Sequence, residues 1–189
     1  MILVEGESEE ISLPILGFRK RFILSQRKIQ VYNSKSKQKL KEDFFSLKAK
    51  YPSLKIVCIL DDDAVTEKND IERVIEGHKD QYNLVFIPKG TFEDLFDLPS
   101  SIVILNELYP EGDEIVLADF DMAKTFLKNI KSILYTKKKA TFDKVAFARR
   151  MAFQMDIEKL PPEIQAIFDL VKDFTEPTSF VKSKSRSES

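Results

Sequence analysis

The chain has 189 residues, of which 43% are apolar and 32% are charged, and its formal net charge at pH 7 is −1. This balance is typical of a soluble globular protein that buries one core. Near-neutrality excludes a global field that attracts nucleic acid, so any such attraction must come from a local basic surface. One cysteine and one histidine exclude a disulfide framework and argue against a zinc site.

We expect a cytoplasmic protein, because targeting and membrane signals are missing from the pattern. The first apolar stretch is only a few residues long and acidic residues follow at once, which argues against a signal peptide. No apolar window approaches the length that crosses a bilayer. The phosphate-loop pattern GxxxxGK[ST] is also absent, which excludes nucleotide hydrolysis by that route.

Taken in chain order, short apolar runs alternate with longer amphipathic runs, and then helical patterns follow alone. Strands are predicted at 2–5, 27–33, 55–60 and 82–88, with helices between them at 11–24, 34–50 and 67–76. Further helices are predicted at 99–108, 119–134, 140–155 and 161–174. The alternation predicts an α/β fold with about four mostly parallel strands and helices on both faces of the sheet. The polar, Ser- and Lys-rich tail from residue 177 is predicted to be disordered.

Acidic residues follow three of the predicted strands. Glu5 ends the first strand, Asp61 and Asp63 follow the third, and Glu93 lies in the turn after the fourth. Ligands of open parallel sheets bind beyond the carboxyl ends of the strands. Glu9 lies four residues after Glu5, so a helix that starts at once brings it to the same place. We therefore expect these carboxylates to gather at one edge of the sheet.

Carboxylates without histidine or cysteine suit a hard cation that takes oxygen ligands, Mg²⁺ or Mn²⁺. In the sequence DDDA, alternate residues of an extended segment point the same way, so Asp61 and Asp63 can act together while Asp62 faces elsewhere. Any one of these acids taken singly is better explained as a solvated loop residue or a helix cap. Three acidic groups at three strand ends favour a metal site.

A basic segment lies later in the chain. Between Lys124 and Arg150, the only acidic residue is Asp143. Such a concentration predicts a surface that contacts phosphates, although a solvated helix face is the simpler explanation of any single charge run. The residues predicted to bind nucleic acid are Lys137, Lys138, Lys139, Arg149 and Arg150.

The segments VEGESEE, ILDDDA and IPKGTFEDLF resemble the three acidic motifs of the Toprim fold, in the form carried by OLD-family (overcoming lysogenisation defect) nucleases. The resemblance implies that Glu5 and Glu9 are the two glutamates of the first motif. Asp61 and Asp63 match the acidic pair of the second motif, and Glu93 matches the acid of the third. Together they would hold two cations.

The resemblance also extends to a lysine and to the domain limits. TFDKVAFARRMA is similar to the segment that carries the family's catalytic lysine, which would be Lys144. A surface lysine on an amphipathic helix is an equally good reading of this residue. The resemblance implies a Toprim catalytic domain at residues 1–155, and the sequence pattern adds a C-terminal helical extension at 156–176 and a tail at 177–189.

The function implied by the resemblance is a Mg²⁺- or Mn²⁺-dependent endonuclease or nickase that acts on DNA, with a role in phage defence. Two alternatives stay open: another Toprim phosphoryl transferase, primase-like or RNA-processing, and a non-catalytic subunit that binds nucleic acid or an ATPase. The acid set favours catalysis, because a module that only binds has no reason to gather repelling carboxylates. OLD proteins usually carry an ATPase ahead of this domain, so an excised domain or a short variant is expected, with an ATPase in trans or a homodimer as further partners.

Overall fold

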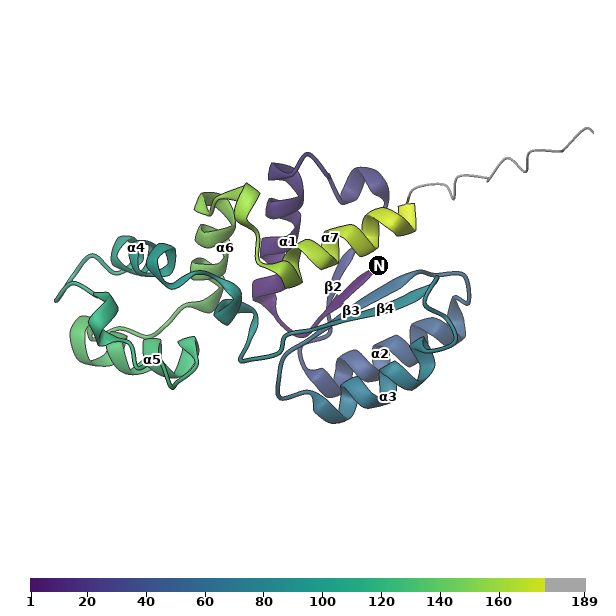
Figure 1. Ribbon diagram of the computed structural model, residues 1–189, viewed down its shortest axis with the longest axis horizontal. Helices are drawn as coiled ribbons and strands as arrows, with labels where there is room; N and C mark the ends of the chain where they lie inside the picture. Colours follow the sequence, from purple (N-terminus) through teal and green to yellow (C-terminus); the bar gives the residue numbers. More distant parts are fainter. Residues whose placement is uncertain (176–189) are drawn as a thin grey trace, which may run out of the picture.

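The computed structural model describes residues 1–175, in which four parallel strands form one sheet (Figure 1). The strands are β1 (Ile2–Val4), β2 (Val31–Asn33), β3 (Ile56–Leu60) and β4 (Tyr82–Phe86), in the order β2-β1-β3-β4. β1 pairs with both β2 and β3, and β3 pairs with β4 along its whole length. The predicted α/β class and parallel sheet are confirmed.

Seven α-helices surround or extend this sheet in the described residues. They are α1 (Glu7–Arg19), α2 (Lys37–Lys50), α3 (Val65–Ile75), α4 (Leu98–Leu108), α5 (Phe126–Ile133), α6 (Lys144–Gln154) and α7 (Pro162–Thr175). A π-helical segment, Leu134–Lys138, continues α5. Short 3₁₀ helices lie at Ser25–Arg27, Phe92–Leu95, Leu117–Asp119 and Ile157–Lys159.

Most predicted elements shift at their ends, and the first helix, the second strand and the helix predicted from residue 119 differ most. The first helix ends at Arg19 rather than residue 24, and the strand predicted at 27–33 forms only at Val31–Asn33. The first helix begins at Glu7 rather than at residue 11, because the extended Gly6 is its N-cap residue. Three glutamates lie in its first turn, where they suit the positive end of the helix dipole. The helix predicted from residue 119 begins only at Phe126. The tail predicted from residue 177 lies outside the described residues.

Alternate residues of the strands pack against helices on opposite faces of the sheet. On one face, Ile2 and Val57 pack in a core with apolar residues of α1, α6 and α7. On the other face, Leu3 and Cys58 pack with residues of α2 and α3. Figure 1 shows these two layers, with α1 and α7 above the sheet and α2 and α3 below it. Because β3 is covered on both faces, its five residues are all buried.

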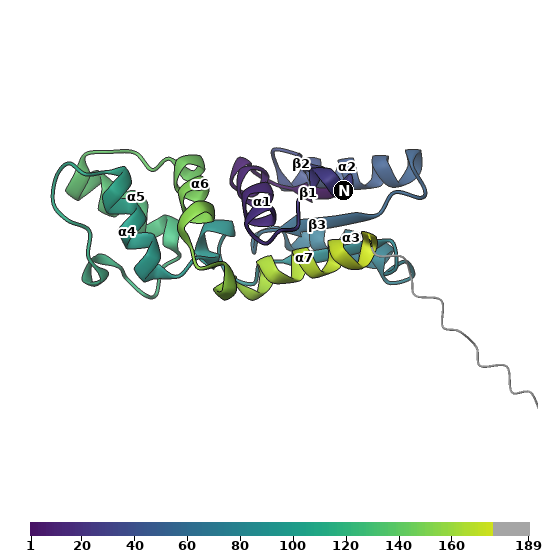
Figure 2. The ribbon, with the colours of Figure 1, turned by 90° about the horizontal axis from the view of Figure 1, so that it is seen from above.

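α4, α5 and α6 lie beyond the carboxyl ends of the strands and form a helical lobe, residues 98–154 (Figures 1 and 2). α6 packs beside α1: the Ser12 hydroxyl donates to the Ala148 carbonyl at 3.1 Å, and the Arg19 guanidinium donates to the Ala152 carbonyl at 2.9 Å. These two contacts mean that the helices run in the same direction. Their first turns therefore lie together, at the edge where the strands end.

α7 returns to cover the sheet. Ile164, Phe168 and Val171 are buried in the same core as the strands. This helix makes up most of the segment 156–176 that the sequence predicts as a C-terminal extension. Among residues 1–175, no helix is both long enough and apolar enough to span a bilayer.

Candidate active site at the carboxyl ends of the strands

The topology places a switch point between β1 and β3. From β1 the chain passes through α1 to β2 on one side, and from β3 it passes through α3 to β4 on the other side. Because α1 and α3 cover opposite faces of the sheet (Figure 1), the connections diverge here, which is where open α/β sheets bind ligands. Glu5 follows β1 and Asp61 follows β3. The backbone N–H of Asp61 donates to the Glu5 carboxylate at 2.9 Å.

Glu9 and Asp61 are carboxylates in a poorly solvated setting. Glu9 is only 4% exposed, and burial, followed by the charges of Glu93 and Glu5, raises its pKa to about 7. Burial and then the charges of Glu9 and Glu5 raise the pKa of Asp61 to about 8. The pKa of Glu5 is also raised, mainly by burial. Desolvated acids that lie this close oppose one another's ionisation.

One oxygen of this group is left without a partner. Asp61 Oδ1 is buried and makes no hydrogen bond to any described residue. Buried polar atoms are rarely unpaired, and exceptions call for an explanation such as an ion or a ligand. The atom lies among acids, so a cation is the group that its surroundings favour.

Glu93 has a different environment, although it belongs to the same acidic group. Its side chain is 1% exposed. One oxygen accepts the Ser8 hydroxyl at 2.5 Å, and the other accepts the Thr91 hydroxyl at 2.6 Å. The ammonium of Lys144 lies 3.3 Å from the second oxygen. The structure therefore brings Lys144, the first residue of α6, to the acidic edge of the sheet.

The second motif divides its three aspartates between different tasks. The Asp63 carboxylate is exposed and pairs with Lys37 of α2 at 2.9 Å. Its position therefore differs from that of the desolvated carboxylate of Asp61. Asp62 accepts the backbone N–H of Gly90 at 2.6 Å and donates its own N–H to the Gly90 carbonyl at 3.2 Å. This pair of bonds joins the loop after β3 to the loop after β4.

The sequence interpretation did not select four residues that shape this edge: Ser8, Thr91, Lys37 and Glu67. Glu67 is buried in the first turn of α3, and its charge contributes to the raised pKa of Glu5. Its position early in the helix that follows the DDDA segment could have indicated it. Ser8 and Thr91 are hydroxyl residues next to predicted acids, but only the folded chain shows that both contact Glu93.

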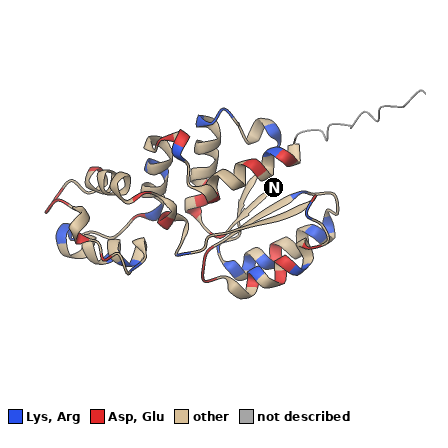
Figure 3. Cartoon of the chain, viewed as in Figure 1, with Lys and Arg blue, Asp and Glu red and all other residues tan. Residues whose placement is uncertain are grey.

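The predicted nucleic-acid-binding residues do not form one uniform surface. Lys137 pairs with Asp119 at 2.6 Å, and Arg150 pairs with Glu107 at 3.1 Å. The Lys139 ammonium donates to a carbonyl of its own turn at 3.0 Å. Arg149 is exposed and has no hydrogen-bond or ion-pair partner among the described residues. Lys138 is partly exposed. Figure 3 shows basic and acidic residues interleaved, most clearly on α2 and α3.

The donor chemistry of the acidic edge fits a hard cation. Glu5, Glu9 and Asp61 offer only oxygen ligands, and no cysteine or histidine lies among them. Within residues 1–175, no three Asp, Glu, His or Cys side chains are already arranged around one point as a metal site. Side chains would therefore have to rotate for Glu5, Glu9 and Asp61 to share a cation. Asp63, which is turned to Lys37, and Glu93, which is turned to its two hydroxyls, would have to leave these partners to join them.

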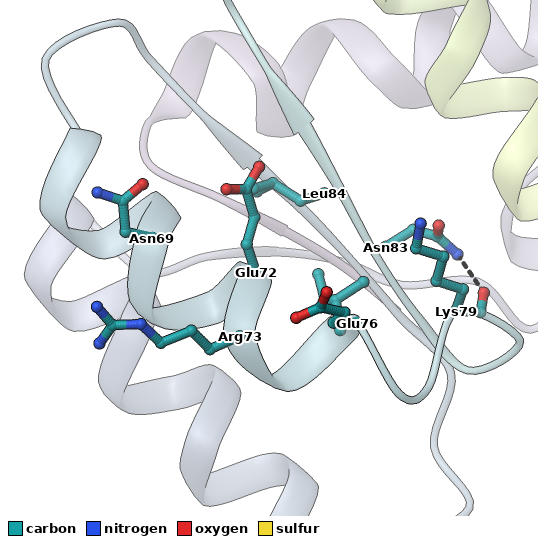
Figure 4. A pocket seen from close by; sticks show the side chains of 8 residues that line it. Asn69, Glu72, Arg73, Glu76, Lys79, Asn83 and Leu84 are labelled. Carbon is teal, nitrogen blue, oxygen red and sulfur yellow. Dashed lines mark hydrogen bonds between the residues drawn. The ribbon is translucent and has the colours of Figure 1, made fainter.

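One cavity among the described residues lies away from this edge. It measures about 650 Å³ and lies between α3 and the outer strand β4, where Glu72, Arg73 and Lys79 line it (Figure 4). The acids at the strand ends take no part in its walls. Its charged side chains have mixed sign and extend toward solvent, so it offers no chemistry comparable with that of the acidic edge.

Comparisons with known proteins find likeness in structure alone. No protein-family model and no curated protein matches the sequence. A solved C-terminal region of the OLD protein of Xanthomonas campestris pv. campestris superposes with a TM-score of 0.67, at 19% identity over 91% of this chain and 91% of that one. The C-terminal region of the Burkholderia pseudomallei OLD protein superposes with a TM-score of 0.62, at 15% identity over 93% of this chain and 97% of that one.

The chain has the fold of the OLD C-terminal region. The Toprim-type architecture that the three acidic motifs imply is thereby confirmed. Because one fold can host several chemistries, the activity has to be argued from the acidic edge itself.

Proposed function

We propose that the chain hydrolyses phosphodiester bonds of DNA with the help of divalent cations, Mg²⁺ or Mn²⁺. The observation that carries this proposal is the gathering of Glu5, Glu9 and Asp61 at the switch point between β1 and β3, where Asp61 bonds to Glu5 and the charges of Glu5 and Glu9 act on Asp61. Burial raises the pKa values of all three, and the charges of neighbouring carboxylates raise them further. A cation offsets such repulsion and gives the unpartnered Asp61 Oδ1 a ligand to bind.

Glu5, Glu9 and Asp61 would hold the cations, with Asp63 joining them after it leaves Lys37. Two bound cations supply an activated water and stabilise the charge on the phosphoryl oxygens. The backbone N–H of Asp61, through its bond to Glu5, keeps the first and second motifs in register. The ammonium of Lys144 contacts Glu93 and acts electrostatically on Glu9 and Asp61, and it would offset negative charge that develops on the phosphate.

DNA would be bound through its backbone by the basic residues of the helical lobe. Arg149, Lys138 and Lys139 are accessible for phosphate contacts, whereas Lys137 and Arg150 would first have to exchange their acidic partners for phosphate. A role in phage defence, and an ATPase or a second copy as partner, rest on the resemblance to OLD nucleases and are part of the proposal.

The test is cleavage of supercoiled plasmid DNA in the presence of Mg²⁺, Mn²⁺, Ca²⁺ or EDTA, with parent and variant proteins. Glu5→Gln removes one charge from the cation ligands and should lower the rate at least about 10²-fold, while DNA binding persists. Glu7→Gln is the matched control, because the exposed Glu7 has no hydrogen-bond or ion-pair partner in the described chain. Cleavage by Glu5→Gln at the parent rate would exclude the nuclease and favour a binding module.

A further inference from the structure

Glu93 differs from the other acids of the edge because each of its carboxylate oxygens already has a donor. Ser8 donates to one oxygen and Thr91 to the other, at 2.5 and 2.6 Å. Hydrogen bonds from hydroxyls to a carboxylate are short and strong when the acceptor is ionised. Ser8 is itself 4% exposed, so moving Glu93 away would leave a buried hydroxyl without a partner, which is unfavourable. Asp61, in contrast, keeps a buried oxygen unoccupied.

The third group on Glu93 is the ammonium of Lys144, 3.3 Å away. The backbone of Lys144 is held in place, because Asp143 caps α6 through the Ala146 N–H at 2.9 Å and Phe147 is buried. The lysine side chain itself is 45% exposed and has four flexible carbons. Its direction is therefore set by its contact with Glu93.

We propose that Glu93 is a positioning residue: with Ser8 and Thr91 it holds the ammonium of Lys144 beside the cation ligands, and it does not bind the cations itself. The inference rests on the proposed function, and it changes the role that the sequence predicts for Glu93 as a metal ligand. Glu93 therefore has a different role from Glu5, Glu9 and Asp61, although all four lie at the same edge of the sheet. We call the contacts of Ser8, Thr91 and Lys144 with Glu93 the lysine clamp.

The clamp has a chemical purpose in phosphoryl transfer. A lysine stabilises a developing charge only when its ammonium lies at the right place before the reaction begins. A misplacement of about 1 Å costs on the order of 10²-fold in rate. The buried carboxylate of Glu93 attracts the ammonium, and the two hydroxyls keep that carboxylate from turning toward a cation.

Metal binding separates the two roles of Glu93 without an activity assay. Melting temperatures are measured in EDTA and in millimolar Mn²⁺ for the parent, Glu93→Gln and Asp61→Asn. We expect Glu93→Gln to keep the Mn²⁺-dependent rise of the parent, whereas Asp61→Asn loses most of it. Loss of the rise in Glu93→Gln to the same extent as in Asp61→Asn would overturn the proposal, because Glu93 would then be a ligand.

Cleavage kinetics show whether Glu93 acts through Lys144. Glu93→Gln should lower kcat by roughly 10²-fold with little change in KM. The double variant Glu93→Gln/Lys144→Ala should be no slower than Lys144→Ala, because residues that act as one unit do not add. If the double variant instead lowers kcat by the product of the two single-variant factors, the two residues act independently and the clamp is contradicted.

A labelling experiment tests the clamp even if the protein does not cleave DNA. Lysines are acetylated with acetic anhydride, and the rate at Lys144 is compared by mass spectrometry with that at Lys128, an exposed lysine of α5. The contact with Glu93 at 3.3 Å holds the Lys144 amine in place and restricts its access to the reagent, so the Lys144/Lys128 ratio should rise several-fold in Glu93→Gln. An unchanged ratio overturns the clamp, whereas absent cleavage with a risen ratio overturns only the proposed function.

If Glu93→Gln does not fold, as judged by circular dichroism, the pair Thr91→Val and Thr91→Ser replaces it. Serine retains the hydroxyl that donates to Glu93, and valine removes it. We expect Thr91→Ser to keep the parent labelling ratio and cleavage rate, and Thr91→Val to raise the ratio and lower the rate. Equal behaviour of the two variants would contradict a role for this hydroxyl in the clamp.

Discussion

The backbone N–H of Asp61 donates to the carboxylate of Glu5 at 2.9 Å, so the residues that end two neighbouring strands are joined directly. The bond satisfies one oxygen of Glu5 and sets the distance between the first and second acidic motifs. It needs both residues to leave the sheet at the same level, which the parallel pairing of β1 with β3 ensures. The acidic edge is thus a product of strand register.

The raised pKa values predict that the protein without metal is more stable in mild acid than at alkaline pH. The pKa of Asp61 rises from 3.8 to about 8 and that of Glu9 from 4.5 to about 7. The folded state therefore binds more protons than the unfolded state between these values, and stability falls as pH rises through them. Two variants, Asp61→Asn and Glu9→Gln, should flatten this dependence.

Thermal unfolding in EDTA between pH 5 and pH 9 checks this prediction. Between pH 5 and pH 9, the free energy of unfolding of each variant should fall less than that of the parent, by on the order of 2 kcal/mol. This difference corresponds to roughly 4–8 °C in melting temperature. Glu10→Gln is a control, since Glu10 is exposed on the same helix. Parallel curves for the parent and Asp61→Asn would show that Asp61 ionises normally.

We predict that Lys37 and a divalent cation compete for the carboxylate of Asp63. The two side chains pair at 2.9 Å, so Lys37→Gln should free Asp63 and remove a nearby positive charge. The rise in melting temperature at a fixed Mn²⁺ concentration should then increase. A tenfold gain in affinity corresponds to about 1.4 kcal/mol of additional stabilisation once Mn²⁺ is in excess of Kd. Asp63→Asn should reduce the rise. Lys41→Gln breaks the neighbouring pair with Asp70 and is the control that should leave the rise unchanged. If Lys37→Gln and Asp63→Asn also leave the rise unchanged, Asp63 is not a ligand.

Two adjacent arginines of α6 should contribute unequally to DNA binding. Arg149 has no ion-pair partner in residues 1–175, whereas Arg150 pairs with Glu107 at 3.1 Å. A free cation releases more counterions from the phosphate backbone than one that must leave a partner. Arg149→Gln should therefore weaken binding more and lower the slope of log K against log salt by about 1. Fluorescence anisotropy at several salt concentrations measures this, and equal slopes for Arg149→Gln and Arg150→Gln would refute it.

Gly90 should tolerate no side chain. Its φ is +76°, and a Cβ placed there would overlap the carboxylate of Asp94, which in turn accepts the N–H of Phe126 at the start of α5. Gly90→Ala should lower stability by about 1–3 kcal/mol. Gly77→Ala is the matched control, because nothing lies within 4 Å of a Cβ there, and it should change stability by less than about 0.5 kcal/mol. Equal melting temperatures for the two variants would show that the Gly90 turn can relax.

The sequence alone determined the class of fold and the place of the acids along the chain. Apolar runs such as 56–60, buried at every residue, and the alternation with amphipathic segments reflect local burial, which periodicity records. Glu5 and Asp61 come directly after strands and Glu93 lies in the turn that follows β4, so parallel pairing alone was enough to predict their common edge. The start of α1 at Glu7 was missed, because glutamates at a helix N-terminus carry no apolar periodicity.

The tertiary structure decided which partner each side chain has. Lys144 meets Glu93 because α6 runs beside α1 in the same direction, a contact between residues 51 positions apart that no local pattern encodes. Likewise, Ser8 and Thr91 converge on one carboxylate, Asp63 turns to Lys37, and Lys137 pairs with Asp119. Composition shows that charges are present, but only packing determines which of them are desolvated and which are neutralised by a neighbour, because both depend on distance and burial.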